Sequence, residues 1–280
     1  MITNRRSNLM RSLTAQGRLK DADMDLAECA LLLAGLDRPD SELSPFRNHL
    51  AKIVRDVRTV VPSDGARHVA GQAQVLASTL SDKYNYEGDT LTYDDPQNAN
   101  LIRVIQRRKG LPITLAILYI HVAREQGWAA TGINFPGHFL IRLEEGGGQL
   151  ILDPFNGGVT RDIADLRGLL KQMTGIEAEL QPEHCAPIGN RQMLMRLLNN
   201  IKFRATAAKD PQRVAEILDR MLMVAPDHLE LLSEAGQCHA EIGNMRRAIA
   251  ALEKVVTHSL NDSLRRESEA LLRQVRARLN

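Results

Sequence analysis

The chain has 280 residues and a mass of 31.2 kDa, which suit one large domain or two of ordinary size. Hydrophobic residues make up 44% and charged residues 25%, the balance of a globular protein with a sizeable core. The net charge of +2 and the 4% of aromatic residues argue against a nucleic-acid partner. No apolar run has the length of a membrane-spanning helix, so we expect no membrane association.

The three cysteines, Cys29, Cys185 and Cys238, are far apart and show no zinc-binding spacing. This usage predicts a reducing cytoplasmic location, no metal and no other cofactor. The first twenty residues contain no acid and five basic side chains: Arg5, Arg6, Arg11, Arg18 and Lys20. They form either a targeting segment or a basic helical tail, and Arg11 disfavours secretion because it interrupts the apolar stretch.

Apolar residues at helical spacing predict several helices before residue 110. We expect helices from Leu9 to about Gly35, from Ser44 to Val61, from about Gly65 to Leu80, and from about Asn98 to Arg108. The last of these helices is expected to end in residues 107–110, Arg-Arg-Lys-Gly, because basic residues and glycine are common at the C-terminal ends of helices.

The region from Pro112 to Asp153 is the most informative part of the chain. A helix that begins at Pro112 is apolar nearly all round, which predicts a buried helix, and Gly127 ends it. Three predicted strands follow, over Thr131–Phe135, His138–Leu143 and Gln149–Asp153. The glycine-rich segment 145–148 predicts a hairpin turn, and a further helix is expected over Asp162–Thr174.

The last ninety residues are helical in pattern and weakly self-similar. The segment Gln181–Pro187 is the best linker between this part and the rest. The spacing of Leu232, Ala235, Gly236, His239, Gly243, Ala248, Leu252 and Val255 is similar to that of a tetratricopeptide repeat, with a degenerate copy 34 residues earlier. Two repeats need a neighbour, such as a terminal helix over Ser263–Leu279 or the preceding domain, and a plain helical bundle is the alternative.

His138 and Asp153 are the residues that point to chemistry. If the turn occupies Glu144–Gly147, Leu143 pairs with Gly148 and His138 lies opposite Asp153. A carboxylate there would orient the imidazole, as in the base half of a nucleophile triad. The alternatives are a purely structural pair and a retained pocket without catalysis.

Four segments together resemble the bacterial SirB-type proteins, which are transglutaminase-like proteins with tetratricopeptide repeats. The segments are Tyr84-Asn85-Tyr86, residues 107–113 (Arg-Arg-Lys-Gly-Leu-Pro-Ile), residues 134–139 (Asn-Phe-Pro-Gly-His-Phe) and residues 153–158 (Asp-Pro-Phe-Asn-Gly-Gly). The resemblance covers roughly residues 20 to 260. It implies an α+β fold: a mostly helical transglutaminase-like, papain-like domain with a small antiparallel sheet, then an all-α repeat domain.

Carried over by position, the resemblance makes His138 the histidine and Asp153 the aspartate of a transglutaminase-like site. The family's nucleophilic cysteine would stand at Pro112, so both the thiol and the backbone N–H of an oxyanion hole are missing. Thr114 lies about 200° further round the helix and is expected to bond to the backbone. Cys185, beside His184, is a weak substitute nucleophile, whereas Cys29 and Cys238 are expected in the core.

The residues expected to bind a ligand come from the four resembling segments: Tyr84, Tyr86, Arg108, Asn134, Phe135, Phe155 and Asn156. Tyr93 belongs with the two tyrosines, which either line a groove or anchor a loop. The basic residues Arg103, Arg107, Arg108 and Lys109 either attract an anion or complete a helix end.

These observations predict a transglutaminase-like domain over residues 1–185 and a repeat domain over residues 186–280. Because the thiol is missing, we expect a non-catalytic module with a protein or peptide partner. The alternative is a hydrolase or acyltransferase that uses His138 and Asp153 with an unconventional nucleophile.

Overall fold

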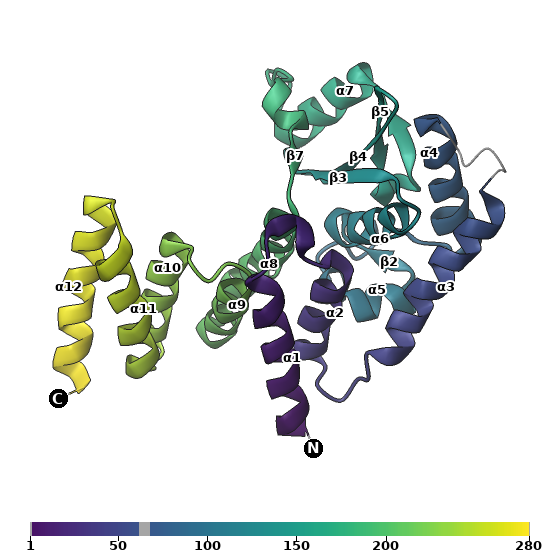
Figure 1. Ribbon diagram of the computed structural model, residues 1–280. Helices are drawn as coiled ribbons and strands as arrows, with labels where there is room; N and C mark the ends of the chain where they lie inside the picture. The colour runs from purple at the N-terminus through teal and green to yellow at the C-terminus, as the bar shows by residue number, and fades with distance from the viewer. Residues whose placement is uncertain (1, 62–67, 280) are drawn as a thin grey trace. The chain divides into compact units, whose positions relative to one another are not determined.

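A computed structural model describes residues 2–61 and 68–279 (Figure 1). The protein is mostly helical, of the α+β class, with a five-stranded antiparallel sheet in its N-terminal part. The chain divides into two compact units. The first holds residues 1–12 and 20–197, and the second holds residues 13–19 and 198–280.

The N-terminal helical region is interrupted, contrary to the single helix expected from Leu9 to Gly35. Helix α1 (Ile2–Gly17) is followed by a 3₁₀ turn (Asp21–Asp23) and by α2 (Leu26–Asp37). The carboxylate of Asp25 accepts a hydrogen bond from the Glu28 N–H at 2.9 Å and so caps α2. An aspartate that bonds to the backbone in this way favours a helix start over a helix interior.

The next helices begin close to the expected positions. Helix α3 (Ser44–Val60) has Pro45 in its first turn, as predicted. Helix α4 (Val69–Ala77) continues into a π-helical turn (Ser78–Lys83); residues 65–67 of the expected helix lie outside the described residues.

Helix α5 (Leu101–Arg107) follows a 3₁₀ turn (Pro96–Ala99), and its end differs from the expected glycine stop. Arg108, with φ of 63°, is the left-handed cap, and Gly110 instead belongs to a short strand. That strand, β2 (Lys109–Gly110), pairs in parallel with β1 (Glu87–Gly88).

Helix α6 (Pro112–Glu125) is buried nearly all round, as the sequence predicts. It packs against β3 (Ala129–Ile133) and β4 (Leu140–Glu145) of the sheet. The remaining strands are β5 (Gly148–Asp153), β6 (Val159–Arg161) and β7 (Pro187–Ile188), and the order across the sheet is β6-β5-β4-β3-β7. Strand β7 comes from the segment that the sequence predicts as a linker.

The β4–β5 hairpin is present, but its register differs from the expected one. Leu143 pairs with Leu150 rather than with Gly148, and Glu145 pairs with Gly148. The turn is therefore only Gly146 and Gly147, whose φ angles of 56° and 83° are typical of a tight two-residue hairpin turn. His138 lies before β4 and is not a strand residue.

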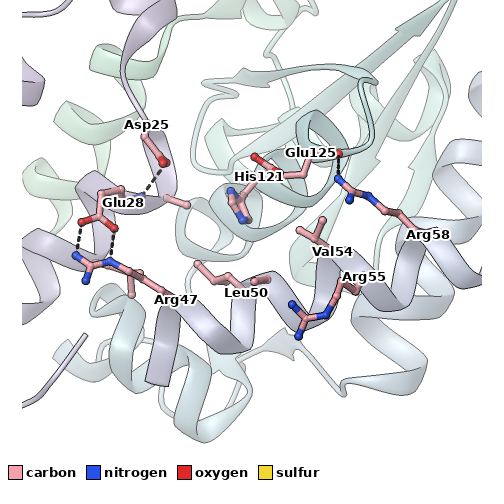
Figure 2. A pocket seen from close by; sticks show the side chains of 12 residues that line it. Asp25, Glu28, Arg47, Leu50, Val54, Arg55, Arg58, His121 and Glu125 are labelled. Carbon is pink, nitrogen blue, oxygen red and sulfur yellow. Dashed lines mark hydrogen bonds and ion pairs between the residues drawn. The ribbon is translucent and has the colours of Figure 1, made fainter. Parts of the chain in front are cut away.

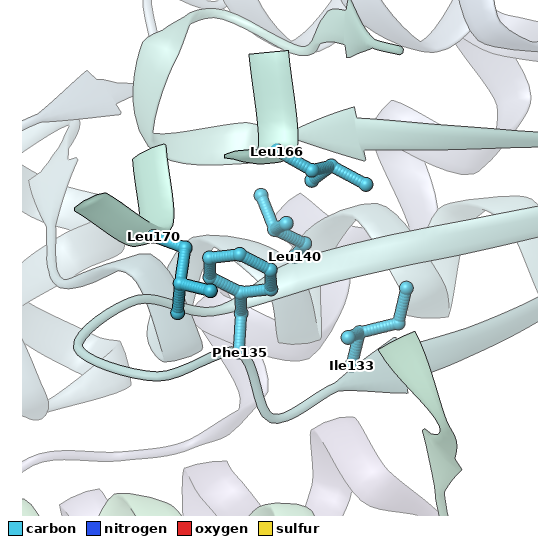
Figure 3. Packing of buried hydrophobic residues seen from close by; sticks show 5 residues of the cluster. All are labelled: Ile133, Phe135, Leu140, Leu166 and Leu170. Carbon is cyan, nitrogen blue, oxygen red and sulfur yellow. The ribbon is translucent and has the colours of Figure 1, made fainter. Parts of the chain in front are cut away.

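Helix α7 (Ile163–Thr174) begins as predicted, with Asp162 and Asp165 forming a reciprocal capping box. Figure 3 shows how Leu166 and Leu170 of this helix pack on Ile133, Phe135 and Leu140. This apolar contact fixes α7 beside the segment that carries His138.

The second unit is a set of antiparallel helices. They are the C-terminal part of α8 (Asn190–Ala207), then α9 (Pro211–Val224), α10 (Leu229–Glu241), α11 (Met245–His258) and α12 (Asp262–Leu279). A Cβ atom added to Gly236 would lie 2.7 Å from Cγ of Leu252, so the small residue allows α10 and α11 to approach closely, as predicted. The expected terminal helix is α12, whose Leu272 and Val275 pack on Ala248 and Leu252.

None of the helices within residues 2–61 and 68–279 combines the length and apolar character that crossing a bilayer requires.

Candidate functional site

His138 and Asp153 are in direct contact. The Nε2 atom of His138 lies 2.9 Å from Oδ1 of Asp153, and the two residues are 6% and 0% exposed. The contact forms although the predicted strand register is wrong, because a turn before β4 places His138 beside Asp153, the last residue of β5.

Local turns position both side chains. The His138 N–H donates to the Phe135 carbonyl at 3.0 Å, and Gly137 between them has φ of 69°. With Pro136 before that glycine, the segment is a type II turn. Asp153 ends β5 and caps the 3₁₀ turn Pro154–Asn156, where its carboxylate accepts from the Asn156 N–H at 3.3 Å.

The Asp153 carboxylate is held as an anion. Its Oδ2 accepts from Nδ2 of Asn156 at 2.8 Å and from Nη2 of Arg161 at 2.9 Å. Burial raises the pKa of Asp153, but these hydrogen bonds and the contact with His138 outweigh it and lower the pKa to about 2.

An ionised Asp153 fixes the tautomer of a neutral His138. The carboxylate accepts the proton on Nε2, so Nδ1 carries a lone pair. Nδ1 has no hydrogen-bond partner among the described residues. In its neutral form His138 therefore offers one unoccupied acceptor, as a general base or a ligand-binding group would.

His138 lines a pocket of about 780 Å³. One wall consists of Phe155 and Tyr93, whose rings meet edge to face at 5.9 Å, and Phe155 also contacts the His138 ring at 5.8 Å. The opposite wall is α7, which presents Ala164, Asp165, Gly168, Leu169, Gln172 and Met173. A volume of this size suits a small ligand or a short peptide segment.

The position expected for a nucleophile holds no reactive side chain. Pro112 is the first residue of α6 and is buried. The Thr114 hydroxyl lies 2.8 Å from the Asn98 carbonyl and 2.9 Å from the Leu111 carbonyl, so it bonds to the backbone as expected.

Within the described residues the three cysteines form no disulfide, and none lines the His138 pocket. Burial raises the pKa of Cys29 to about 12 and also raises the pKa of Cys185 and Cys238. Cys29 and Cys238 are buried, as predicted, and Cys185 packs against the cluster around Phe135. A raised pKa lowers the thiolate fraction, so these groups are poor nucleophiles.

Of the predicted binding residues, Phe155 and Asn156 line the His138 pocket, together with Tyr93. Asn134 is exposed, and its Oδ1 accepts from Nε of Arg196 at 3.1 Å. Phe135 is 1% exposed and packs under α7, so it supports the pocket from behind and has no surface for a ligand (Figure 3).

Tyr84, Tyr86 and Arg108 form a separate cluster with α3. His49 Nε2 lies 2.9 Å from the Tyr86 hydroxyl and 2.7 Å from Nη1 of Arg108. The Tyr84 hydroxyl donates to Asp56 at 2.7 Å. Tyr86 is 0% exposed, so it anchors the loop rather than lining a groove.

The basic run does not form an unpaired patch. Arg107 donates to the buried carboxylate of Asp89 at 2.8 Å, and Lys109 lies 3.1 Å from Glu87. Arg103 donates to the side chain of Gln106 at 3.1 Å. The contacts support the interpretation of these cations as structural.

Sequence reasoning missed Thr90, Arg161 and the α7 wall of the pocket. Arg161 lies near Asp153 because strand β6 pairs with β5 and places Val159 opposite Asp153. The alternation of side chains along residues 159–161 is the sequence pattern that could have indicated this contact. His184 does not line the His138 pocket, and its Nδ1 accepts from the Gln181 N–H. Within the part of the chain that the structure describes, no three His, Cys, Asp or Glu side chains are arranged to hold a metal.

Comparison with known proteins supports the two-part organisation. Residues 44–199 match the model of the transglutaminase-like superfamily, and residues 201–280 match a tetratricopeptide repeat model. A UPF0162 protein of Xylella fastidiosa is 32% identical over 240 residues, with 84% of each chain covered. A UPF0162 protein of Vibrio cholerae is 26% identical and covers 91% of this chain and 92% of its own length. Human F-box only protein 21 is 29% identical over 184 residues, which are 61% of this chain but 29% of that protein.

Proposed function

Because the chain belongs to the UPF0162 family and joins a transglutaminase-like core to tetratricopeptide repeats, we propose that it is a non-catalytic protein-interaction module. One observation carries the proposal. The His138–Asp153 pair faces a pocket, and the position at which the resemblance to transglutaminase-like proteins implies a nucleophile is the buried Pro112. The protein would then use a former reaction site to bind a peptide, in a regulatory role.

The repeats support the interaction half of this proposal. Tetratricopeptide repeats give the chain a capability for protein–protein interaction, since stacked helix pairs present extended surfaces. A stretch of 184 residues, 61% of this chain, is 29% identical to a region that makes up 29% of human F-box only protein 21. A region that is combined with different neighbours suits an interaction module.

The pocket itself has the chemistry of a peptide site. Tyr93 and Met173 line it and are 41% and 42% exposed, so they offer apolar surface to a ligand. The Nδ1 lone pair of His138 would accept a hydrogen bond from a backbone N–H, a hydroxyl or an ammonium group. We propose that these groups bind an extended peptide segment of a partner.

The test is direct binding by the purified full chain. A partner is first captured from the native cell and identified, and its affinity is then measured by titration calorimetry. His138→Gln should weaken the affinity about tenfold, the value of one hydrogen bond at about 1.4 kcal/mol. His258→Gln, at an exposed position in the second unit, is the matched control. Equal affinities for the two variants and the wild type would show that His138 does not contribute to binding, contrary to the proposal.

A hydrolase that uses water as its nucleophile is the second candidate. The 2.9 Å contact between His138 and Asp153 and the open pocket beside the ring favour it. Amide hydrolysis and glutamine–amine transfer are measured on peptide substrates. Turnover that disappears in a folded His138→Gln variant would replace the non-catalytic proposal with this one.

We also propose a cytoplasmic location. Cys29, Cys185 and Cys238 form no disulfide within the described residues, which supports this location, since a reducing compartment keeps cysteines as thiols. Fractionation of the native cell tests this point.

A further inference from the structure

A second pocket of about 460 Å³ lies among α2, α3 and α6 of the first unit (Figure 2). It shares no lining residue with the His138 pocket. Its lining includes three arginines and three carboxylates, a balanced set of charges around an apolar floor. The arrangement of these groups indicates what the pocket would bind.

One side of the pocket is closed by internal contacts. Arg47 donates from Nε to Glu28 Oε2 at 2.8 Å and contacts the other carboxylate oxygen through Nη2. Asp25 caps α2 at the same side. These groups form a fixed wall, because the charges of Arg47 and Glu28 already compensate each other.

The other side offers unused donors. Arg55 has no hydrogen-bond partner among the described residues, and Arg58 donates from Nη2 to the Glu125 carbonyl at 3.0 Å. The two arginines are three residues apart on α3, so their side chains lie on the same face of the helix. Each of these guanidinium groups has N–H donors that suit a carboxylate.

His121 stands between the two sides (Figure 2). Its ring nitrogens have no hydrogen-bond partner in residues 2–61 and 68–279. Burial lowers the pKa of His121, whereas Asp25 and Glu125 act in the opposite direction, so the surroundings of the ring are negative. A neutral imidazole with two nearby carboxylates suits an ammonium group.

The two charge-binding regions are about one helical turn apart. His121 and Glu125 are four residues apart on α6, a separation of about 5–6 Å between Cβ atoms. Arg58 donates to the backbone carbonyl of Glu125, so its guanidinium group lies about one turn of α6 from His121. The floor between them is formed by Leu31, Leu50 and Val54. A small molecule with both charges and a short apolar group matches this spacing.

We propose that this pocket binds a free α-amino acid with an apolar side chain. The carboxylate lies against Arg55 and Arg58, the ammonium group lies between His121 and the carboxylates of Asp25 and Glu125, and the side chain covers Leu31 and Leu50. The proposal stands independently of the function proposed for the His138 pocket, since the two sites share no residue.

The test uses the full chain and three probes that differ in one charged group. L-Leucine carries both charges, 4-methylpentanoate lacks the ammonium group, and 3-methylbutylamine lacks the carboxylate. Titration calorimetry and ligand-observed NMR should show leucine binding about tenfold or more tightly than either half-ligand. L-Norvaline, which lacks one of the two terminal methyl groups of leucine, should bind about fourfold more weakly than leucine.

Three variants locate the site. Arg55→Gln should weaken leucine binding about tenfold, and Arg167→Gln, at an exposed helical arginine outside both pockets, should leave it unchanged. Ala51→Phe fills the pocket from an exposed position of α3 and should abolish binding. Circular dichroism and the unfolding midpoint check that each variant folds.

Three results would overturn the proposal. In the first, leucine fails to bind to the folded wild type at millimolar concentration. In the second, 4-methylpentanoate binds as tightly as leucine, which would make the pocket a carboxylate site with no role for the ammonium group. Binding of leucine that survives both Arg55→Gln and Ala51→Phe would place the ligand elsewhere and would also overturn it.

Discussion

Each of the two units contains a buried histidine in contact with an aspartate. His138 Nε2 lies 2.9 Å from Asp153 in the first unit, and His239 Nε2 lies 2.9 Å from Asp219 in the second. In each pair the second carboxylate oxygen accepts from an arginine, Arg161 in one case and Arg247 in the other. The contact distance alone therefore says nothing about function.

The two pairs differ in what surrounds them. The Asp153 side chain is 0% exposed, whereas that of Asp219 is 27% exposed. Nδ1 of His239 lies 3.5 Å from Nδ2 of Asn244, and Nδ1 of His138 has no hydrogen-bond partner in the described ranges. A free nitrogen beside a pocket, rather than the histidine–aspartate contact, makes the first pair a candidate site.

Replacement of the aspartate should give the largest difference in stability between the two histidine–aspartate pairs. Asp153→Ala is expected to lower the free energy of unfolding by about 3 kcal/mol, because it leaves buried partners without a counter-charge. Asp219→Ala should cost about 1 kcal/mol, because water reaches that carboxylate. Urea unfolding of both variants measures the difference. Similar losses would show that the two pairs are energetically equivalent.

The pH dependence of stability gives a second contrast. The pKa of Asp153 falls from 3.8 to about 2 on folding, so the unfolded chain binds a proton first as the pH falls. The stabilisation by this group is complete above about pH 4 and is lost toward about pH 2, a change of about 2 kcal/mol. Unfolding at several pH values should show this loss in the wild type and not in Asp153→Asn.

The control for lost charge is Asp227→Asn, at an exposed position. An unchanged slope in Asp153→Asn between these pH values would contradict the assignment of the depressed pKa to this residue.

Replacement of the arginine in each pair should give a smaller difference in stability. The Arg161 side chain is 26% exposed and makes two contacts with Asp153, so Arg161→Gln should cost about 1 kcal/mol. The Arg247 side chain is 63% exposed, and Arg247→Gln should change stability by less than about 0.5 kcal/mol. Thermal unfolding of the two variants compares them. A larger loss for Arg247→Gln would reverse the expected order.

The smallest expected difference between the two pairs is in the rate at which their histidines are chemically labelled. Diethylpyrocarbonate acylates an unprotonated imidazole nitrogen, so His138 should be modified before His239, both of whose nitrogens have neighbours. Peptide mass spectrometry after short exposure resolves the two sites. Equal rates would mean that Nδ1 of His138 is not accessible from the pocket.

The parts of the fold that depend on nearby residues could be predicted from the sequence. The buried helix from Pro112 follows from its apolar periodicity, and the start of α7 follows from the Asp162 cap. The strand register could not be predicted, because three consecutive glycines allow more than one turn. Only the positive φ angles of Gly146 and Gly147 select the observed pairing.

The candidate site was only partly predictable for a related reason. His138 and Asp153 were found from their order on the chain, but Thr90 and α7 reach the same pocket from distant segments. Tyr86 illustrates the opposite error. It stands in a turn-rich, polar stretch, yet it is buried because His49 and Arg108 satisfy its hydroxyl group. Such compensation between distant side chains leaves no local pattern.

The close packing of Phe155 on Gly88 has a consequence for how this family can diverge. A Cβ atom at position 88 would lie 2.5 Å from the Phe155 ring. Any larger residue there would push the ring toward His138 or out of the pocket wall. Substitution of residue 88, which does not line the pocket, can thus change the shape of the pocket while the histidine and aspartate stay in place. In alignments of relatives, position 88 should therefore vary together with position 155 rather than with position 138.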